Sequence, residues 1–345
     1  MNGQVHPLCS ICIANYNGEH VLSDCIDSLL TQTGGIPVEI IIHDDASTDR
    51  SLALLRERYP VDMYPNIRVI ESQENVGFCI SNNRMVETAR GKYVLLLNND
   101  AALAPDALIT LLTASQAQSP EGILTLPQRD WESYDVVDRG CLLDPFYNPV
   151  PNIDPARRDV AMVIGACMWL PRLLWKELGG FPDWFESIAE DMYLCCRARL
   201  AGYPVQTTAG SYYRHRQGAS FGGGRASDNG LSTTYRRRRL SERNKTFVMV
   251  LCSPLLRLCL ILPLHLILLA IEGASLTLFK RNAKLFIVIY WNVFQSLFMQ
   301  ARHLHGERHK IHRLRRITPR VYGNVFIIFP RKLKLLLHYG LPEIR

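Results

Sequence analysis

The chain has 345 residues, of which 48% are hydrophobic, and its 39 Lys and Arg outnumber its 32 Asp and Glu. This content supports a sizeable core, excludes a globally disordered chain, and fits one large domain or two ordinary ones. The positive surplus concentrates in the last third, in "YRRRRLSERNK" and "RHLHGERHKIHRLRR". Such clusters suit an anionic surface, either lipid head groups or nucleic acid.

The ten cysteines are irregularly spaced, and we find no signal-peptide pattern. We therefore expect reduced thiols in a cytosolic setting. The motif "CSIC" resembles a metal knuckle, but it lies in a predicted strand, where Cys9 and Cys12 point to opposite faces. No second pair follows at the spacing of a zinc finger, so we do not expect zinc.

Strands and helices alternate over the first hundred residues. Continuous apolar runs predict strands at 8–14, 38–44, 67–72 and 92–97, and helical periodicity predicts helices near 21–32, 47–59 and 80–90. Ser47 or Thr48 is the expected cap of the second helix. This alternation predicts a mostly parallel sheet covered by helices on both faces.

Polar side chains follow every one of these strands: "ANYN", "HDDAS", "ESQENVGF" and "NNDA". Ligands of such sheets bind beyond the carboxyl ends of the strands. We therefore expect Asp100 to lie at this edge of the sheet, beside Asp44 and Asp45.

The pattern loosens after residue 100. We predict a helix at 105–118, an irregular insertion from Gln128 to Arg158, a strand at 160–171, a helix closed by Gly179, a helix at 189–203 and a strand from 211. The glycines at 222–224 lack the ending of a phosphate-binding loop. Either a lid over the site or a plain linker accounts for them.

Two apolar segments, 246–273 and 285–299, lie between basic tracts. Pro254, Arg257, Pro263 and His265 interrupt the first, and the second is short for a membrane span. We favour helices that lie in the membrane interface with basic faces on anionic lipid. A spanning hairpin is the next alternative and an internal core the least favoured. These helices could also pair two chains into a homodimer.

Seven motifs occur in a fixed order across residues 8–220: "ANYNGE", "IIHDDASTDRS", "ENVGFCISNNR", "GKYVLLLNNDA", "GACMWLPRLLWKELGGFPDWF", "AEDMYLCCRARLAGY" and "YYRH". With them the chain resembles the family 2 inverting glycosyltransferases of GT-A fold, especially the rhamnosyltransferase-like branch of cell-surface polysaccharide synthesis. The resemblance implies an α/β GT-A domain at 1–240, with a nucleotide-sugar half to about 127 and an acceptor half after it. A membrane-associated helical region at 241–345 follows.

The resemblance also implies roles for individual residues. The donor nucleotide sugar would contact Ala14, Asn15, Tyr16, Asp44, Asp45, Asn75, Asn83, Arg84 and Asn99. Physical chemistry agrees, because a carboxylate accepts the imide N–H of uracil or thymine and an aromatic ring stacks on a base. Trp184 and Phe185 would line the acceptor pocket.

The metal motif of the family, Asp-x-Asp or a relative of it, reads "NND" here. Asp100 and His215 would hold a divalent cation, Mn²⁺ or Mg²⁺, with Asn98 in the place of the first acid. Asp191 would be the base that inversion requires, with Glu190 as its neighbour. Each motif alone has an ordinary explanation, such as helix caps for "DDASTD" or an asparagine-rich turn for "NND"; their joint order favours one shared site.

The expected activity is therefore transfer of a sugar, from dTDP-rhamnose or a UDP-hexose, to a lipid-linked saccharide at the cytoplasmic face of the cell membrane. A dinucleotide-dependent oxidoreductase is disfavoured because "ANYNGE" lacks the Gly-x-Gly-x-x-Gly turn. A degenerate, non-catalytic transferase subunit stays open because of "NND". Nucleic-acid binding through Arg236–Arg239 is disfavoured by the apolar segments beside them.

Overall fold

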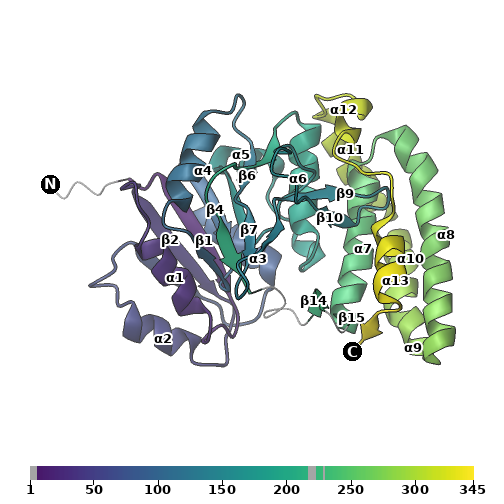
Figure 1. Cartoon of the computed structure of the whole chain (residues 1–345), viewed down its shortest axis with the longest axis horizontal. Coiled ribbons are helices and arrows are strands. Elements are labelled where there is room, and N and C mark those ends of the chain that lie inside the picture. Colours follow the sequence, from purple (N-terminus) through teal and green to yellow (C-terminus); the bar gives the residue numbers. More distant parts are fainter. Residues whose placement is uncertain (1–5, 217–222, 228–229) are drawn as a thin grey trace. The chain divides into compact units, whose positions relative to one another are not determined.

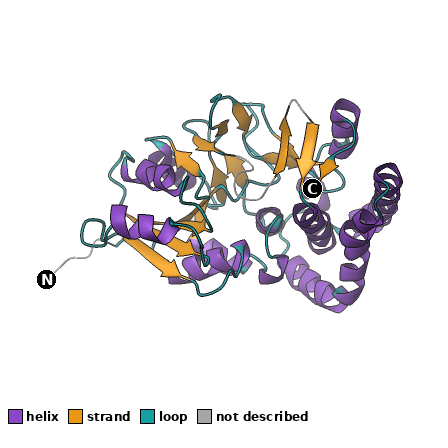
Figure 2. Cartoon of the chain, turned by 90° about the horizontal axis from the view of Figure 1, so that it is seen from below, coloured by secondary structure: helices purple, strands orange, loops and turns teal. Residues whose placement is uncertain are grey.

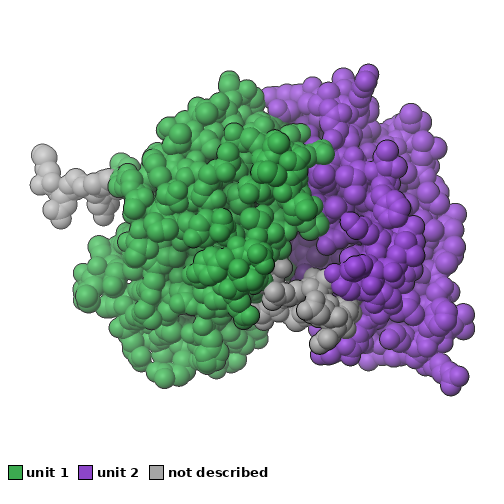
Figure 3. Space-filling model, viewed as in Figure 1, with its two compact units in different colours: residues 1–141, 151–187, 203–220 green, residues 142–150, 188–202, 221–345 purple. Residues whose placement is uncertain are grey.

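The computed structural model describes residues 6–216, 223–227 and 230–345 (Figure 1). The chain divides into two compact units, which Figure 3 distinguishes by colour. Unit 1 comprises residues 1–141, 151–187 and 203–220, and unit 2 comprises residues 142–150, 188–202 and 221–345.

Unit 1 is built on a seven-stranded sheet with the strand order β12-β6-β11-β4-β1-β2-β3. The strands are β1 (Cys9–Asn15), β2 (Val38–Asp44), β3 (Ile67–Glu71), β4 (Tyr93–Leu97), β6 (Ile123–Thr125), β11 (Cys167–Pro171) and β12 (Val205–Thr207). β1 pairs in parallel with both β2 and β4, and β2 with β3, whereas β11 is antiparallel to β4 and β6. The predicted, mostly parallel sheet is confirmed.

Helices cover this sheet on both faces (Figure 2). α1 (Leu22–Leu30) and α4 (Ala107–Gln116) bury their apolar stripes against Ile11, Ile13 and Ile42, which share one face. Successive side chains of a strand point to opposite faces, so Cys12 and Ile41 meet the other side, where α3 (Phe78–Thr88) packs on β1 and β2. The central strands are buried on both faces, which explains their continuous apolar sequences.

The second helix of unit 1, α2 (Ser51–Arg58), begins later than predicted, and neither Ser47 nor Thr48 caps it. The Ser47 hydroxyl instead donates to Asp44, and the Thr48 N–H donates to the Asn17 side chain. The carboxylate of Asp49 accepts the N–H of Ser51 at the helix start. The predicted cap was wrong because Ser47 and Thr48 contact Asp44 and the distant Asn17 instead of the first turn of the helix.

A second sheet of unit 1 has the order β5-β13-β7-β8. It consists of β5 (Ala101–Leu103), β7 (Gln128–Asp130), β8 (Val136–Asp138) and β13 (Tyr213–His215). Two further short strands, β9 (Cys141–Leu143) and β10 (Pro149–Pro151), pair with each other. The segment from Gln128 to Arg158 is therefore not the irregular insertion that the sequence predicted. α5 (Arg172–Leu178) ends at Gly179 in the left-handed conformation, as predicted.

Unit 2 is mainly helical. It contains α6 (Glu190–Leu200), α7 (Tyr235–Cys252), α8 (Leu255–Lys280), α9 (Ala283–Leu285), the π-helix η2 (Phe286–Trp291), α10 (Asn292–Met299), α11 (Ala301–Arg313), α12 (Pro319–Gly323) and α13 (Arg331–Tyr339). Strands β14 (Gly223–Ser227), β15 (Gly230–Thr233) and β16 (Glu343–Ile344) form a small sheet. Gly223 and Gly224, for which we considered a lid or a linker, lie in β14, and Gly222 lies outside the described residues.

Within the described residues, α8 alone is long and apolar enough to cross a bilayer. All ten cysteines are free thiols, and Cys259 on α8 is the one that is exposed.

Candidate active site

The polar ends of the central strands of unit 1 lie at one edge of the sheet. Asn15, the last residue of β1, is in register with Asp44, the last residue of β2. β4 runs parallel to β1, so Asn98, Asn99 and Asp100 leave the sheet at the same edge. The parallel register therefore brings together side chains that are far apart in the sequence.

Asn15 is the centre of a buried network at this edge. Its Nδ2 donates to Asp44 Oδ2 over 2.9 Å, and its Oδ1 accepts from Asn99 Nδ2 over 2.8 Å. The Asp44 carboxylate also accepts the N–H of Ser47 over 3.0 Å and its hydroxyl over 2.8 Å. This network connects the ends of β1, β2 and β4 and holds the Asp44 carboxylate in one orientation. Tyr16, the next residue after β1, has a 51% exposed side chain.

Asp45 holds the loop that precedes α3. Its Oδ1 accepts the N–H of Val76 over 2.8 Å, and its Oδ2 accepts the N–H of Gly77 over 2.9 Å. Gly77 has a φ of 86°, which favours glycine, and α3 begins at the next residue. Asp45 thus fixes the loop in which Asn75 is exposed.

Asp100 lies next to His215. Nε2 of His215 is 3.0 Å from Oδ1 of Asp100, and both side chains are nearly buried. Asn98 Nδ2 is 3.4 Å from the same imidazole nitrogen. The second sheet of unit 1 explains this proximity. His215 in β13 is in register with Ala101 in β5, and Ala101 directly follows Asp100.

The pair is chemically suited to a divalent cation, because one carboxylate and one imidazole converge at a polar edge of the sheet. Among the described residues, no group of three or more His, Cys, Asp or Glu side chains could hold a metal ion. A cation at Asp100 and His215 would therefore need oxygen ligands from elsewhere, and a diphosphate supplies them.

The charge of Asp100 acts on its surroundings. Cys25 on α1 donates its thiol to the Asn98 carbonyl over 3.4 Å. Burial raises the pKa of the Cys25 thiol, and the charges of Asp100 and Asp24 raise it further. The cysteine therefore stays a neutral packing residue beside the site.

Sequence reasoning missed Arg216, which follows His215. Its backbone N–H donates to the Asp100 carbonyl over 3.1 Å, and its guanidinium donates to Asp24 over 2.6 Å. The guanidinium also lies over the Trp131 ring, 3.5 Å from the ring centroid. These contacts join segments that are distant in the sequence, and a tract of alternating basic residues gives no local signal for them.

His43 is a second missed residue. It is fully buried in β2, in register with Ala14, and neither ring nitrogen has a hydrogen-bond partner among the described residues. Burial lowers the pKa of His43; Asp45 acts against this shift and Arg84 adds to it. The imidazole is therefore neutral at the base of the polar edge.

The remaining donor-side candidates lie on and near α3. The Asn83 side chain joins α3 to the 181–183 segment: its Nδ2 donates to the Phe181 carbonyl and to Asp183 Oδ1, and its Oδ1 accepts the Phe181 N–H. Arg84 is exposed, with a guanidinium nitrogen 3.5 Å from Ser72 Oγ.

The two aromatic acceptor candidates differ in exposure. Phe185 is fully buried, whereas Trp184 is half-buried and meets the Phe185 ring edge-on at 4.6 Å between centroids. Trp184 thus presents the accessible aromatic surface, and Phe185 supports it from inside unit 1.

Glu190 and Asp191 begin α6 in unit 2. Burial raises the pKa of the Glu190 carboxyl to about 8; the charge of Asp191 acts in the same direction, and Arg237 on α7 acts against it. Ile188 and Ala189, just before the helix, have φ values of 69° and 68°. Such values are rare for residues other than glycine and cluster at functional sites. Asn244 on α7 donates to the Ile188 carbonyl over 2.8 Å and holds this turn.

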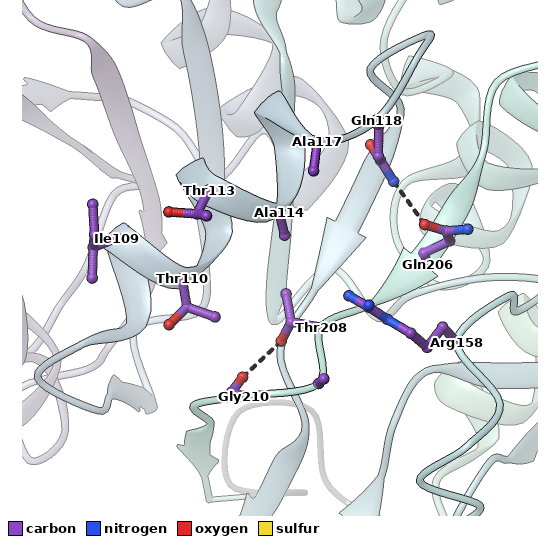
Figure 4. Close-up of a pocket in the computed structure, with 11 residues that line it drawn as sticks. Ile109, Thr110, Thr113, Ala114, Ala117, Gln118, Arg158, Gln206, Thr208 and Gly210 are labelled. Atoms are coloured by element: carbon purple, nitrogen blue, oxygen red, sulfur yellow. Dashed lines mark hydrogen bonds between the residues drawn. The ribbon is translucent and has the colours of Figure 1, made fainter.

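An open hollow of about 560 Å³ lies elsewhere on unit 1 (Figure 4). Thr110 and Thr113 of α4 line one side, and Thr208, Gly210 and Arg158 line the other. None of the candidate site residues lines it, so this hollow is separate from the polar strand ends.

The fold agrees with comparisons to known proteins. The profile of "Glycosyl transferase family 2" matches residues 10–167. The chain is 40% identical to a chondroitin synthase of Escherichia coli over 190 residues. This match covers 54% of this chain and 26% of the synthase. The chain is also 29% identical over 205 residues to a poly(ribitol-phosphate) beta-glucosyltransferase of Bacillus spizizenii. This match covers 58% of this chain and 31% of that enzyme.

Among solved structures, GalNAc-T7, determined with UDP, GalNAc and Mn²⁺, superimposes with a TM-score of 0.57. The two share 14% identity, and the match covers 72% of this chain and 48% of that one. At this identity the likeness concerns the fold, which is of the GT-A type. The chain spans less than a third of the length of the two curated relatives, and its similarity to the glycosyltransferases of family 2 concerns residues 10–167.

Proposed function

We propose that the protein is a metal-dependent, inverting glycosyltransferase. It takes a sugar from a nucleoside diphosphate donor, dTDP-rhamnose or a UDP-hexose, and transfers it to a hydroxyl of a lipid-linked saccharide in cell-surface glycan assembly. The observation that carries this proposal is the juxtaposition of Asp100 and His215, 3.0 Å apart, at the strand edge that also bears the Asn15–Asp44 network.

The donor nucleotide is assigned to the ends of β1 and β2 and the start of α3. The exposed ring of Tyr16 is available to stack on a base. Oδ1 of Asp44 and both oxygens of Asp45 each accept one hydrogen bond, which leaves a lone pair on each for the imide N–H of the base. Arg84 is exposed, its contact with Ser72 is long, and its guanidinium is the proposed partner of a phosphate. Ala14, Asn15, Asn75, Asn83 and Asn99 complete the proposed donor site, with Asn83 acting through the 181–183 segment that it holds.

Asp100 and His215 would hold the cation, which when bound would neutralise the departing diphosphate. The similar fold of GalNAc-T7, solved with UDP and Mn²⁺, supports this assignment. Two contacts within the chain also support the assignment of Asp100 and His215 to the cation. The Asn15–Asn99 hydrogen bond holds the residue before Asp100, and the β5–β13 pairing holds His215 beside the residue after Asp100.

Asp191 is the proposed base. The acceptor oxygen attacks the anomeric carbon from the face opposite the diphosphate, a new C–O bond forms, and the bond to the diphosphate oxygen breaks with its electron pair. The acceptor proton goes to the Asp191 carboxylate. Burial raises the pKa of the Glu190 carboxyl to about 8, which disfavours Glu190 as a base at neutral pH and supports Asp191 in this role.

The acceptor side is assigned to Trp184 and Phe185, because an aromatic surface suits the apolar face of a sugar ring. A lipid-linked acceptor agrees with the apolar helix α8 and the basic character of unit 2, and with action at the cytoplasmic face of the membrane. Pairing of two chains through these helices is compatible with the same arrangement.

A screen of thermal unfolding with nucleoside diphosphates and nucleotide sugars, each with and without Mn²⁺, tests the donor side. We expect stabilisation by a uridine or thymidine diphosphate that increases with Mn²⁺. Equal unfolding temperatures under all conditions would refute the donor assignment. Metal-dependent binding without any sugar transfer would favour the alternative, a non-catalytic subunit of a glycan-assembly complex.

A further inference from the structure

The outward face of α8 is a charge-free apolar stripe. Exposed large side chains follow one another at helical spacing up to Ile271 and return two turns later: Leu256, Leu260, Leu264, Ile267, Leu268, Ile271, Leu278 and Phe279. At about 1.5 Å per residue, the stripe extends over roughly 35 Å. Monomeric soluble proteins rarely expose a continuous apolar surface of this kind.

The charged residues of α8 do not face outward from this stripe. Arg257 stacks on the Phe326 ring, with its guanidinium 3.6 Å from the ring centroid. Glu272 accepts from Lys332 Nζ over 2.6 Å and pairs with Arg238. Lys280 is the last residue of the helix.

The inward face of α8 is joined to a buried network of charges. Besides Glu272, Lys332 pairs with Glu242 of α7 over 2.7 Å. The imidazole of His265 lies 2.9 Å from the Thr246 hydroxyl, and the Tyr290 hydroxyl donates to Glu272 over 3.2 Å. Gly273 allows the Tyr290 ring to pack closely, because a Cβ atom there would lie 2.6 Å from the ring.

This network decides between a spanning and an in-plane helix. About 20 residues of a helix cross the hydrocarbon core, so a spanning α8 would carry Glu272 with its partners Arg238 and Lys332 into it. Charges there are costly. A helix that lies in the membrane plane sinks only its apolar face by about 5–10 Å and leaves the network on the protein side.

The positive charge of the C-terminal region indicates that the apolar face of α8 contacts an anionic membrane surface. Residues 255–345 contain 15 Lys and Arg but only 3 Asp and Glu. Residues 1–254 contain 24 Lys and Arg and 29 Asp and Glu. Exposed Lys280, Arg281 and Lys284 follow the end of the stripe directly. A surplus of 12 positive charges in this region complements anionic lipid head groups.

We propose that α8 docks in the plane of an anionic phospholipid bilayer, as a monotopic anchor that does not cross it. This inference rests on the proposed function, in which the protein acts on a lipid-linked acceptor at a membrane. It specifies how unit 2 attaches to that membrane. The occupant of the stripe is the head-group and upper acyl region of the lipid, and the basic residues at the C-terminal end of α8 contact the anionic head groups.

Flotation of the full chain with phospholipid vesicles tests the docking. We expect binding to vesicles that contain phosphatidylglycerol, weaker binding to pure phosphatidylcholine, and a loss of about tenfold or more in the double variant Leu264→Glu and Ile267→Glu. Leu173→Glu, at an even more exposed leucine on α5 of unit 1, is the control and should bind as the parent does. Unimpaired binding of the double variant would overturn the proposal.

Depth measurements separate the two membrane topologies. Cys259 is the one exposed native thiol, and a fluorophore there is compared with one at Leu268→Cys, nine residues or about 13 Å further along the helix. Lipids with quenchers at a shallow or a deep acyl position report the depth of each. Equal, shallow depths support the in-plane helix; a shallow Cys259 with a deep position 268 would show a span and overturn it.

Two further outcomes have a defined meaning. If the parent chain forms a dimer that Leu264→Glu and Ile267→Glu disrupts, and does not bind vesicles, the stripe is covered by a second copy and the proposal is wrong. Nucleoside diphosphate binding by the same variants is measured in parallel. Its retention separates a failure of docking from a failure of the proposed transferase function.

Discussion

The imidazole of His215 lies 3.0 Å from the carboxylate of Asp100, although 115 residues separate them in the chain. Two pairings produce this contact: β4 brings Asp100 to the polar edge of the main sheet, and β13 pairs with β5 directly after it. The proposed function assigns one shared cation to this carboxylate and imidazole.

Replacing Asp100 tests this pair. Asp100→Asn keeps the size of the side chain but removes its charge, so we expect Mn²⁺ affinity in the presence of a nucleoside diphosphate to fall by about 100-fold, and sugar transfer with it. Titration calorimetry measures the first and product formation the second. Asp62→Asn, at an exposed position, is the control; equal Mn²⁺ affinities in both variants would rule out Asp100 as a ligand.

Asn15→Asp tests the network at the strand ends. The new carboxylate would face Asp44 directly across the β1–β2 register and would also replace the amide that donates to it. Repulsion between like charges should lower nucleotide affinity by about tenfold at neutral pH, with partial recovery at acidic pH as one carboxylate becomes protonated. Asn66→Asp serves as control. If the nucleotide affinity of Asn15→Asp does not change with pH, repulsion between the new carboxylate and Asp44 is not the cause of the loss.

The buried Glu190 carboxyl predicts a dependence of stability on pH. Its pKa is about 8 in the folded state and close to its ordinary value of about 4.3 in the unfolded chain. Below about pH 4.3 both states hold the proton; as the pH rises to about 8, only the folded state does, so the free energy of unfolding decreases over this window.

Chemical denaturation of the parent chain and of Glu190→Gln across this window measures the effect. The glutamine has no proton to release, so the difference in free energy of unfolding between the two proteins should shift in favour of the variant as the pH rises. A difference that stays constant from pH 5 to 8 would show that Glu190 is not held protonated.

Asn244 positions the turn that carries the proposed base. Asn244→Ala removes the hydrogen bond to the Ile188 carbonyl, so we expect kcat to fall by about tenfold with KM for the donor unchanged, and the pH profile of kcat to shift. Asn282→Ala, which removes another amide of unit 2 at the start of α9, is the matched control. A parallel rise in KM alone would contradict a positioning role.

The charge network of α7 makes a prediction about stability. Glu242 is buried and pairs with Lys245 over 2.6 Å, and burial lowers the pKa of Lys245 to about 8. Glu242→Ala would leave Lys245 buried without its counter-charge, at an expected cost of about 3–5 kcal/mol in the free energy of unfolding. The double variant Glu242→Leu with Lys245→Met should recover much of this loss. Equal destabilisation of the single and double variants would be inconsistent with an unpaired charge as the cause.

Sequence patterns were sufficient for the central strands, because β1, β2 and β4 are buried on both faces and therefore continuously apolar. The same patterns located Asn15, Asp44 and Asp100 at one edge, since parallel strands end on the same side. The first turn of α6, with Glu190 and Asp191, also begins where the local sequence indicated.

Features that depend on distant partners escaped prediction. β7 pairs with β13, more than 80 residues later, so its short sequence resembled irregular structure. Ser47 resembled a helix cap, but its hydroxyl accepts the N–H of Asn17, 30 residues earlier in the chain. Arg216 and His43 gave no local signal because their environment comes from Trp131, Asp24 and α3, which only the fold brings near.

The most direct test of the central claim is the release of nucleoside diphosphate by the purified full chain, given a nucleotide sugar, Mn²⁺ and a membrane fraction that contains lipid-linked saccharide. The parent chain should release it together with a glycosylated lipid, and the variants Asp100→Asn and Asp191→Asn should each lose at least about 99% of the rate. A double variant that turns over as fast as the parent would contradict the proposed active site.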